Sequence, residues 1–167
     1  MQFFDYMFWL YPPEKDEKIN KQMTHLAILF NHFQPIVLYG LQYYYGIGVS
    51  KISTLMISLY ILVAIPYTYK AIKDIDSTKE KEGVMYWRWN VQKHYELMYS
   101  IFVVSMITSG LNFKDKSLKI LIVVSTLITL YIGHKQNMLN ISMGRMWCYY
   151  ASFTPLVFIL HYFIMYK

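Results

Sequence analysis

Cysteine, glycine, proline and charged residues are all scarce in this chain. Cysteine occurs once in 167 residues, which excludes a disulfide framework, a cysteine-based zinc site and an iron–sulfur cluster. Only seven glycines and five prolines accompany 56% hydrophobic residues, which excludes collagen-like repeats and disorder. Charged residues make up 16% of the chain, against about 25% in an average soluble domain. This composition predicts a single all-α membrane domain.

Sequence signals of catalysis and of nucleotide binding are also missing. The chain has no GxGxxG or Walker A motif, and no acidic residue lies inside an uncharged run to orient a catalytic histidine. The histidines lack the close spacing of membrane di-iron enzymes, so a haem held by His25 and His94 is the remaining metal alternative. We expect no enzymatic activity, no metal and no cofactor. The net charge of +6 is spread between apolar runs, and we expect no nucleic-acid partner.

Five long runs without Asp, Glu, Lys or Arg dominate the rest of the sequence. They cover residues 22–50, 52–69, 97–113, 120–134 and 146–166. A helix needs about 20 mostly apolar residues to cross a bilayer, with a range of roughly 17–25. The runs predict a polytopic bundle of about five transmembrane helices, near residues 23–45, 52–70, 94–112, 117–135 and 146–165. The fourth reaches spanning length if Lys119 extends toward the interface, and buried helices of a soluble protein are the alternative.

Residues 1–22 precede the first run, and we expect them on the cytoplasmic side or in the interface. Their aromatic side chains suit a helix in the membrane surface that ends at Pro12 and Pro13, and a packed N-terminal turn is the alternative. A second aromatic group, at residues 86–89, fits a belt at the lipid headgroups.

Lysine and arginine are distributed unequally between the two ends of the predicted helices. Eleven lie in the N-terminal segment and in the loops after the second and fourth helices, and five lie on the other side. Cytoplasmic loops usually carry the excess of basic residues. The count therefore places the N-terminus in the cytoplasm and the C-terminus across the bilayer.

Small residues at four-residue spacing mark the faces by which membrane helices approach one another. They form stripes on the last three predicted helices, made of Ser105 and Ser109, of Ser125, Thr129 and Gly133, and of Gly144, Cys148 and Ser152. We expect these stripes to pack helices within the chain, in a homo-oligomer or against other membrane proteins. Pro35, Pro66 and Pro155 interrupt three helices, and each leaves a carbonyl without its donor.

The first predicted helix has two different faces. Its apolar arc suits lipid and consists of Leu26, Phe30, Phe33, Val37, Leu41 and Tyr44. Its polar sector consists of Thr24, His25, Asn31, His32, Tyr39, Gln42 and Tyr43. Polar groups lose free energy against hydrocarbon, so we expect this sector to face protein or water.

Ionisable residues at the start of the third predicted helix supply a counterpart to that sector. Glu96 lies at the edge of the span beside His94, and an ionisable residue near membrane depth is a functional candidate. An ion path or polar pocket between the first and third helices would be lined by His25, Asn31, His32, His94 and Glu96. The alternatives are plain interhelical hydrogen bonds and, for Glu96, pairing with water or Lys93.

Parts of the chain resemble the first five helices of heliorhodopsins. The residues that carry the resemblance are 30–34 (FNHFQ), Tyr95-Glu96 with Tyr99-Ser100, and Trp147 with Pro155. The resemblance implies a counterion at Glu96 and a polar-cluster histidine near His32. Heliorhodopsins hold retinal through a lysine of their last helix. The lysines within the predicted spans, Lys70, Lys119 and Lys135, lie at span ends and none lies in a span interior, so the resemblance does not extend to covalent retinal.

Three functions are open from the sequence. The first is a non-enzymatic protein that moves or senses protons or small ions along a path lined by His25, His32, His94 and Glu96. The second is a structural or assembly protein, for example of a viral membrane, in which the same residues only join helices. A membrane enzyme is the weakest of the three, because no set of nucleophile, base and orienting group is visible. A water-filled path would favour the first function, and dry polar pairs would favour the second.

Overall fold

The computed structural model describes residues 2–81, 84–135 and 163, and its fold there is all-α apart from one short hairpin. The elements in chain order are α1 (Gln2–Leu10), α2 (Glu17–Tyr44), α3 (Lys51–Asp74), β1 (Lys79–Lys81), β2 (Val84–Tyr86), the 3-10 helix η1 (Arg88–Val91), α4 (Tyr95–Gly110) and α5 (Lys116–Lys135). The two strands pair antiparallel, with Lys79 opposite Tyr86.

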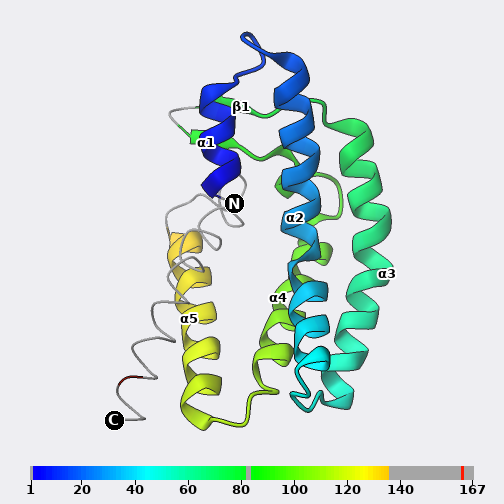
Figure 1. The fold of residues 1–167 in the computed structure, drawn as a ribbon, viewed down its shortest axis with the longest axis vertical. Coiled ribbons are helices and arrows are strands. Elements are labelled where there is room, and N and C mark those ends of the chain that lie inside the picture. The colour runs from blue at the N-terminus through cyan, green and yellow to red at the C-terminus, as the bar shows by residue number, and fades with distance from the viewer. Residues whose placement is uncertain (1, 82–83, 136–162, 164–167) are drawn as a thin grey trace.

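Helices α2 to α5 run alternately up and down the long axis of the molecule (Figure 1). Helices α2, α3 and α4 contact one another and form the centre, while α5 packs against α4 and α1 packs against α2. The hairpin and α1 lie at the same end of this bundle (Figure 1). Helices therefore occupy four of the five ranges that the uncharged runs predict.

Two capping side chains show where the helices begin. Asp16 Oδ1 accepts a hydrogen bond from Ile19 N at 2.9 Å, and Ser50 Oγ accepts one from Ser53 N at 3.1 Å. Helix α2 thus begins at Glu17, earlier than the uncharged run predicts, and α3 continues past its run to Asp74. Both helices extend into charged sequence, because charged residues are good helix formers that tolerate solvent.

Prolines lie inside two helices that continue through them. Pro35 is buried in α2 and Pro66 is exposed in α3, whereas Pro155 lies outside the described residues. Pro35 has no N–H, so the carbonyl of Asn31 loses its usual partner within α2.

The fifth expected helix, 146–165, lies outside the described residues apart from Phe163, and so do Gly144, Cys148 and Ser152. Within the described part of the chain, only α3 is long and apolar enough to cross a membrane, a criterion that a core helix of a soluble protein can also meet. The all-α fold is thus established, while the polytopic arrangement stays a prediction.

The apolar core beside the hairpin corrects one expectation. Trp87 and Trp89 are fully buried, and their rings stack with 5.3 Å between centroids. They pack in one cluster with Phe4 and Phe8 of α1. The predicted headgroup belt at residues 86–89 is therefore wrong for both tryptophans, because the chain folds back there and the rings complete a protein core. A second core, between α3 and α4, consists of Ile57, Tyr60, Ala64, Tyr67, Met98 and Phe102.

Candidate functional site

The two faces of α2 are separated as the helical periodicity predicts. All six residues of the apolar arc are exposed, by 40–81%. Four residues of the polar sector are buried, namely Thr24, Asn31, His32 and Gln42. Tyr43 departs from the pattern, since it is exposed. The polar side of α2 therefore faces protein, and its partners can be followed in three clusters along the bundle.

The His32 cluster, which consists of Asn31, His32, Thr68 and Tyr99, joins α2, α3 and α4 near the middle of the molecule. His32 Nδ1 lies 2.8 Å from Thr68 Oγ1, and His32 Nε2 lies 3.4 Å from the Tyr99 hydroxyl. Asn31 Nδ2 donates to the same hydroxyl at 2.8 Å. Three helices thus meet around one histidine that is 1% exposed.

Donor and acceptor roles in the His32 cluster depend on the tautomer of the His32 ring. The Asn31 amide nitrogen can only donate, so the Tyr99 hydroxyl accepts from it. In the tautomer with the proton on Nδ1, His32 donates to Thr68 Oγ1 and Nε2 can accept from the Tyr99 hydroxyl. In the other tautomer both contacts run in the opposite direction.

Aromatic side chains enclose the His32 cluster. The ring of His32 meets those of Tyr67 and Tyr99 edge-on, with centroids 5.5 and 6.1 Å apart. The buried hydroxyl of Tyr60 donates to the His32 carbonyl at 2.6 Å, in the turn of α2 that Pro35 interrupts. The carbonyl that Pro35 leaves without its helical donor is that of Asn31, so Tyr60 binds the next carbonyl along the same turn.

The Gln42 cluster, made of Gln42, Ser53, Ser109 and Asn112, joins the same helices at the end far from the hairpin. Gln42 Nε2 donates to the Ser109 carbonyl at 2.8 Å. Asn112 Nδ2 donates to Gln42 Oε1 at 3.2 Å and to Ser53 Oγ at 3.0 Å. Asn112 Oδ1 accepts from the backbone N of Ser50 at 3.1 Å. Asn112 thereby connects the end of α4 with both α2 and the start of α3.

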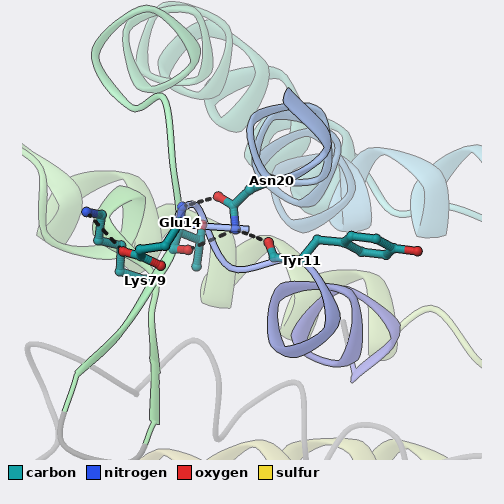
Figure 2. A network of polar contacts seen from close by, with 5 residues as sticks. Tyr11, Glu14, Asn20 and Lys79 are labelled. Atoms are coloured by element: carbon teal, nitrogen blue, oxygen red, sulfur yellow. Dashed lines mark hydrogen bonds and ion pairs between the residues drawn. The ribbon is translucent and has the colours of Figure 1, made fainter. Parts of the chain in front are cut away.

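The Asn20 cluster lies at the hairpin end and consists of Tyr11, Asn20, Thr24 and Thr78. Figure 2 shows Asn20 next to Tyr11, beside the ion pair of Lys79 with Glu14. Asn20 Nδ2 donates to the carbonyls of Tyr11 and Thr78, at 2.8 and 3.1 Å. Asn20 Oδ1 accepts from Thr78 N at 2.9 Å, and the hydroxyls of Thr24 and Thr78 lie 2.9 Å apart. One buried asparagine therefore ties α2 to the turn after α1 and to the segment before β1.

The other predicted pocket residues are not brought to His32. His25 is half-buried, and its Nε2 lies 3.2 Å from the Ile75 carbonyl. His94 is exposed and has a left-handed backbone with φ of 70° just before α4. Glu96 is exposed in the first turn of α4 and accepts from the Tyr95 hydroxyl at 3.3 Å. Since α4 begins only at Tyr95, Glu96 sits at a helix N-terminus, where the helix dipole favours a carboxylate.

The predicted packing stripes have different outcomes. Ser105 and Ser109 are buried in α4, and Ser105 Oγ donates to the Met56 carbonyl of α3 at 3.2 Å. Ser125 is exposed on α5, while its neighbour Thr126 is buried. A helix places neighbouring residues about 100° apart, so α5 faces α4 with a side next to the stripe. For Thr129 and Gly133, the structure describes only the backbone, as part of α5.

Gly110 is the contact residue that the spacing pattern missed. A Cβ added there would lie 2.5 Å from Cγ2 of Ile122 on α5. Only glycine allows the end of α4 to approach α5 this closely. Thr68 and Tyr60 were missed as well. A buried histidine needs hydrogen-bond partners, and these must lie at the same depth on the adjacent helices. The polar residues of the uncharged run 52–69 could have been considered as such partners.

The described part of the chain contains no group of three His, Cys, Asp or Glu side chains that could hold a metal ion. Comparison with protein-family models, with curated proteins and with solved structures finds no match. The resemblance to heliorhodopsins therefore stays a prediction.

Proposed function

We propose that the chain is a polytopic integral membrane protein. The observation that carries this proposal is that polar residues are buried between the helices while many large apolar residues are exposed on the outer faces. Buried polar residues include Asn31, His32, Gln42, Thr68 and Ser105, and exposed apolar ones include Leu26, Val37, Leu55, Leu62, Ile65 and Ile128. Such outer faces suit hydrocarbon, and helices satisfy their backbone groups internally, as a bilayer requires.

Labelling of single cysteines in cells tests this topology. In a Cys148→Ser background, an impermeant thiol reagent is expected to reach Gly48→Cys and Lys114→Cys from outside and Ser77→Cys only after permeabilisation. These positions belong to the loops at opposite ends of the bundle, and the excess of basic residues assigns the hairpin end to the cytoplasm. Labelling of all three positions in a protein that washes off the membrane would contradict the proposal.

We further propose that the protein acts as a non-enzymatic structural or assembly component, with its polar clusters as connections between helices. The clusters are spread over three levels of the bundle, and their hydrogen bonds connect neighbouring helices or adjoining turns. The ionisable residues His94 and Glu96, which an ion path would need, lie apart from His32 on the exposed start of α4. Paired polar groups of this kind support helix association rather than conduction.

Proton transfer or sensing is the second candidate, and one observation favours it. Tyr99, His32 and Thr68 form a chain in which each link can both accept and donate a proton.

Proton flux into liposomes separates the two candidates. The structural function predicts no flux above that of empty liposomes at any pH or voltage. It also predicts that His32→Gln lowers the free energy of unfolding, by about 0.6 kcal/mol for each average interhelical hydrogen bond. A flux that changes between about pH 5 and 8 and disappears in His32→Gln would instead establish proton transfer. Glu96→Gln serves as the matched control, because Glu96 is exposed away from the cluster.

A further inference from the structure

Helix α1 carries two faces that are both apolar. Phe4 and Phe8 are buried in the core with Trp87 and Trp89. On the opposite face, Phe3, Tyr6 and Trp9 are exposed by 62, 60 and 51%. An exposed row of aromatic side chains on a nine-residue helix is unfavourable in water, so this face requires an apolar surrounding.

Contacts along α1 show that it runs antiparallel to α2 and beside it. The ring of Phe4, near the start of α1, lies 5.6 Å from that of Phe30. The carbonyl of Tyr11, just after α1, accepts a hydrogen bond from Asn20 near the start of α2. Figure 1 shows the two helices side by side at the hairpin end. The start of α1 therefore reaches the level of Phe30, a member of the apolar arc of α2.

Polar groups around α1 are placed where they avoid its exposed face. Asp5, the acidic residue of α1, accepts a hydrogen bond from Trp87 Nε1 at 3.0 Å on the side that meets the core. At the end of α1, Lys15 Nζ donates to the Leu10 carbonyl at 3.0 Å and lies over the ring of Tyr11. The polar groups thus lie at the turn that leads to α2 and, for Asp5, on the side of α1 that meets the core.

We propose that α1 enters the cytoplasmic leaflet as a half-membrane helix, with Phe3, Tyr6 and Trp9 against the lipid acyl chains. The proposal rests on the membrane location proposed above. Nine residues at 1.5 Å each span about 13 Å, close to half of the roughly 30 Å hydrocarbon core. The exposed ring of Phe3 lies 5.6 Å from that of Phe4, and Phe4 contacts Phe30 of the lipid-facing arc of α2. The exposed face of α1 therefore borders that arc, and the same apolar surrounding covers both.

Collision measurements on spin labels test this placement in the full chain. The protein, with Cys148→Ser, is labelled at Phe3→Cys or Tyr6→Cys and reconstituted in phosphatidylcholine vesicles. Val37→Cys, on the lipid-facing arc of α2, is the hydrocarbon reference, and Lys18→Cys, exposed in the first turn of α2, is the aqueous reference. Each label is exposed to oxygen, which concentrates in hydrocarbon, and to a water-soluble nickel complex.

We expect labels at residues 3 and 6 to match the reference at residue 37, with high oxygen and low nickel accessibility, and to show the reverse of the label at residue 18. A nickel-accessible label at residue 6 beside an oxygen-accessible label at residue 37 would overturn the insertion of α1 and leave the membrane location standing. A label shielded from both reagents would also overturn it, because protein would then cover the face. Nickel accessibility at residue 37 would remove both proposals.

Discussion

The centre of the bundle and the contact between α4 and α5 are held by different means. Helices α2, α3 and α4 are joined by side-chain hydrogen bonds in the His32 and Gln42 clusters. Helix α5 approaches α4 where the side chain of Ile122 packs against the backbone of Gly110, which has no Cβ to block it. The first contact depends on polar partners and the second on the absence of a side chain.

This difference matters because lipid provides no hydrophobic gain when two apolar helices meet. Membrane helices instead gain stability from close packing and from interhelical hydrogen bonds. Hydrogen bonds specify which residues face each other, so the three central helices have a defined register. A glycine contact specifies only how near two helices lie. Its stability therefore depends on the volume of the side chain at the glycine position and not on the polarity of that side chain.

The largest effect is expected for Gly110→Leu. A leucine at this position meets Ile122, since even a Cβ would lie 2.5 Å from its Cγ2. Overpacking should lower the free energy of unfolding in detergent micelles by about 3 kcal/mol. Gly40→Leu is the matched control, because a Cβ there has nothing within 4 Å. Equal losses from the two substitutions would show that α5 does not depend on close approach to α4.

Asn112→Ala should have the next largest effect. The substitution removes the hydrogen bonds to Gln42 and Ser53 and the one from the backbone N of Ser50. We expect a loss of about 1.5 kcal/mol in the free energy of unfolding, because buried partners are left unpaired. Thr108→Ala is the control, since the Thr108 hydroxyl bonds only to carbonyls of its own helix, those of Val104 and Ser105. If both variants lose the same stability, the Gln42 cluster does not join the helices.

A double-mutant cycle on Asn31 and Tyr99 sharpens the comparison further. Asn31→Ala and Tyr99→Phe each break the 2.8 Å hydrogen bond between α2 and α4. Their combined loss of stability should fall short of the sum by about 0.6 kcal/mol, the average for an interhelical hydrogen bond in a membrane protein. Strictly additive losses would mean that this contact contributes no coupling between the helices.

Much of the fold was predictable from charge gaps and helical periodicity alone. Four helices lie where uncharged runs occur, and the apolar arc of α2 is exposed as predicted. Both signals are local, because they depend on residues within a few turns of each other. The burial of Asn31 and His32 follows from the same periodicity, since polar groups on the opposite side from Phe30 must face protein.

The partners of these residues were not predictable in the same way. Tyr99 lies far from Asn31 in the sequence, and only the relative rotation of α2 and α4 brings the two side chains together. Trp87 reached the core through a hairpin that turns the chain back over α1, whereas its aromatic neighbours suggested a headgroup belt. Glu96 was predicted to face the polar sector, but α4 begins at Tyr95, so Glu96 lies in its first turn with the carboxylate exposed.

The smallest effect is expected for an ion pair that joins the same two segments as the Asn20 cluster. Lys21 Nζ lies 2.6 Å from Asp76 Oδ1, and this contact with the lysine holds the pKa of the Asp76 carboxyl below its ordinary value of 3.8. Because the folded pKa is the lower one, the pair stabilises the protein above the ordinary pKa and loses its contribution as the pH falls through the folded pKa. Asp76→Asn should therefore lower the melting temperature slightly at pH 6, and the difference from the unchanged protein should disappear in strong acid and in high salt.

Asn20→Ala breaks the neighbouring buried contacts with Thr78 and should lower the melting temperature more at every pH, because water does not screen a buried hydrogen bond. A larger loss from Asp76→Asn than from Asn20→Ala would reverse the order of buried and exposed contacts at this end of the bundle.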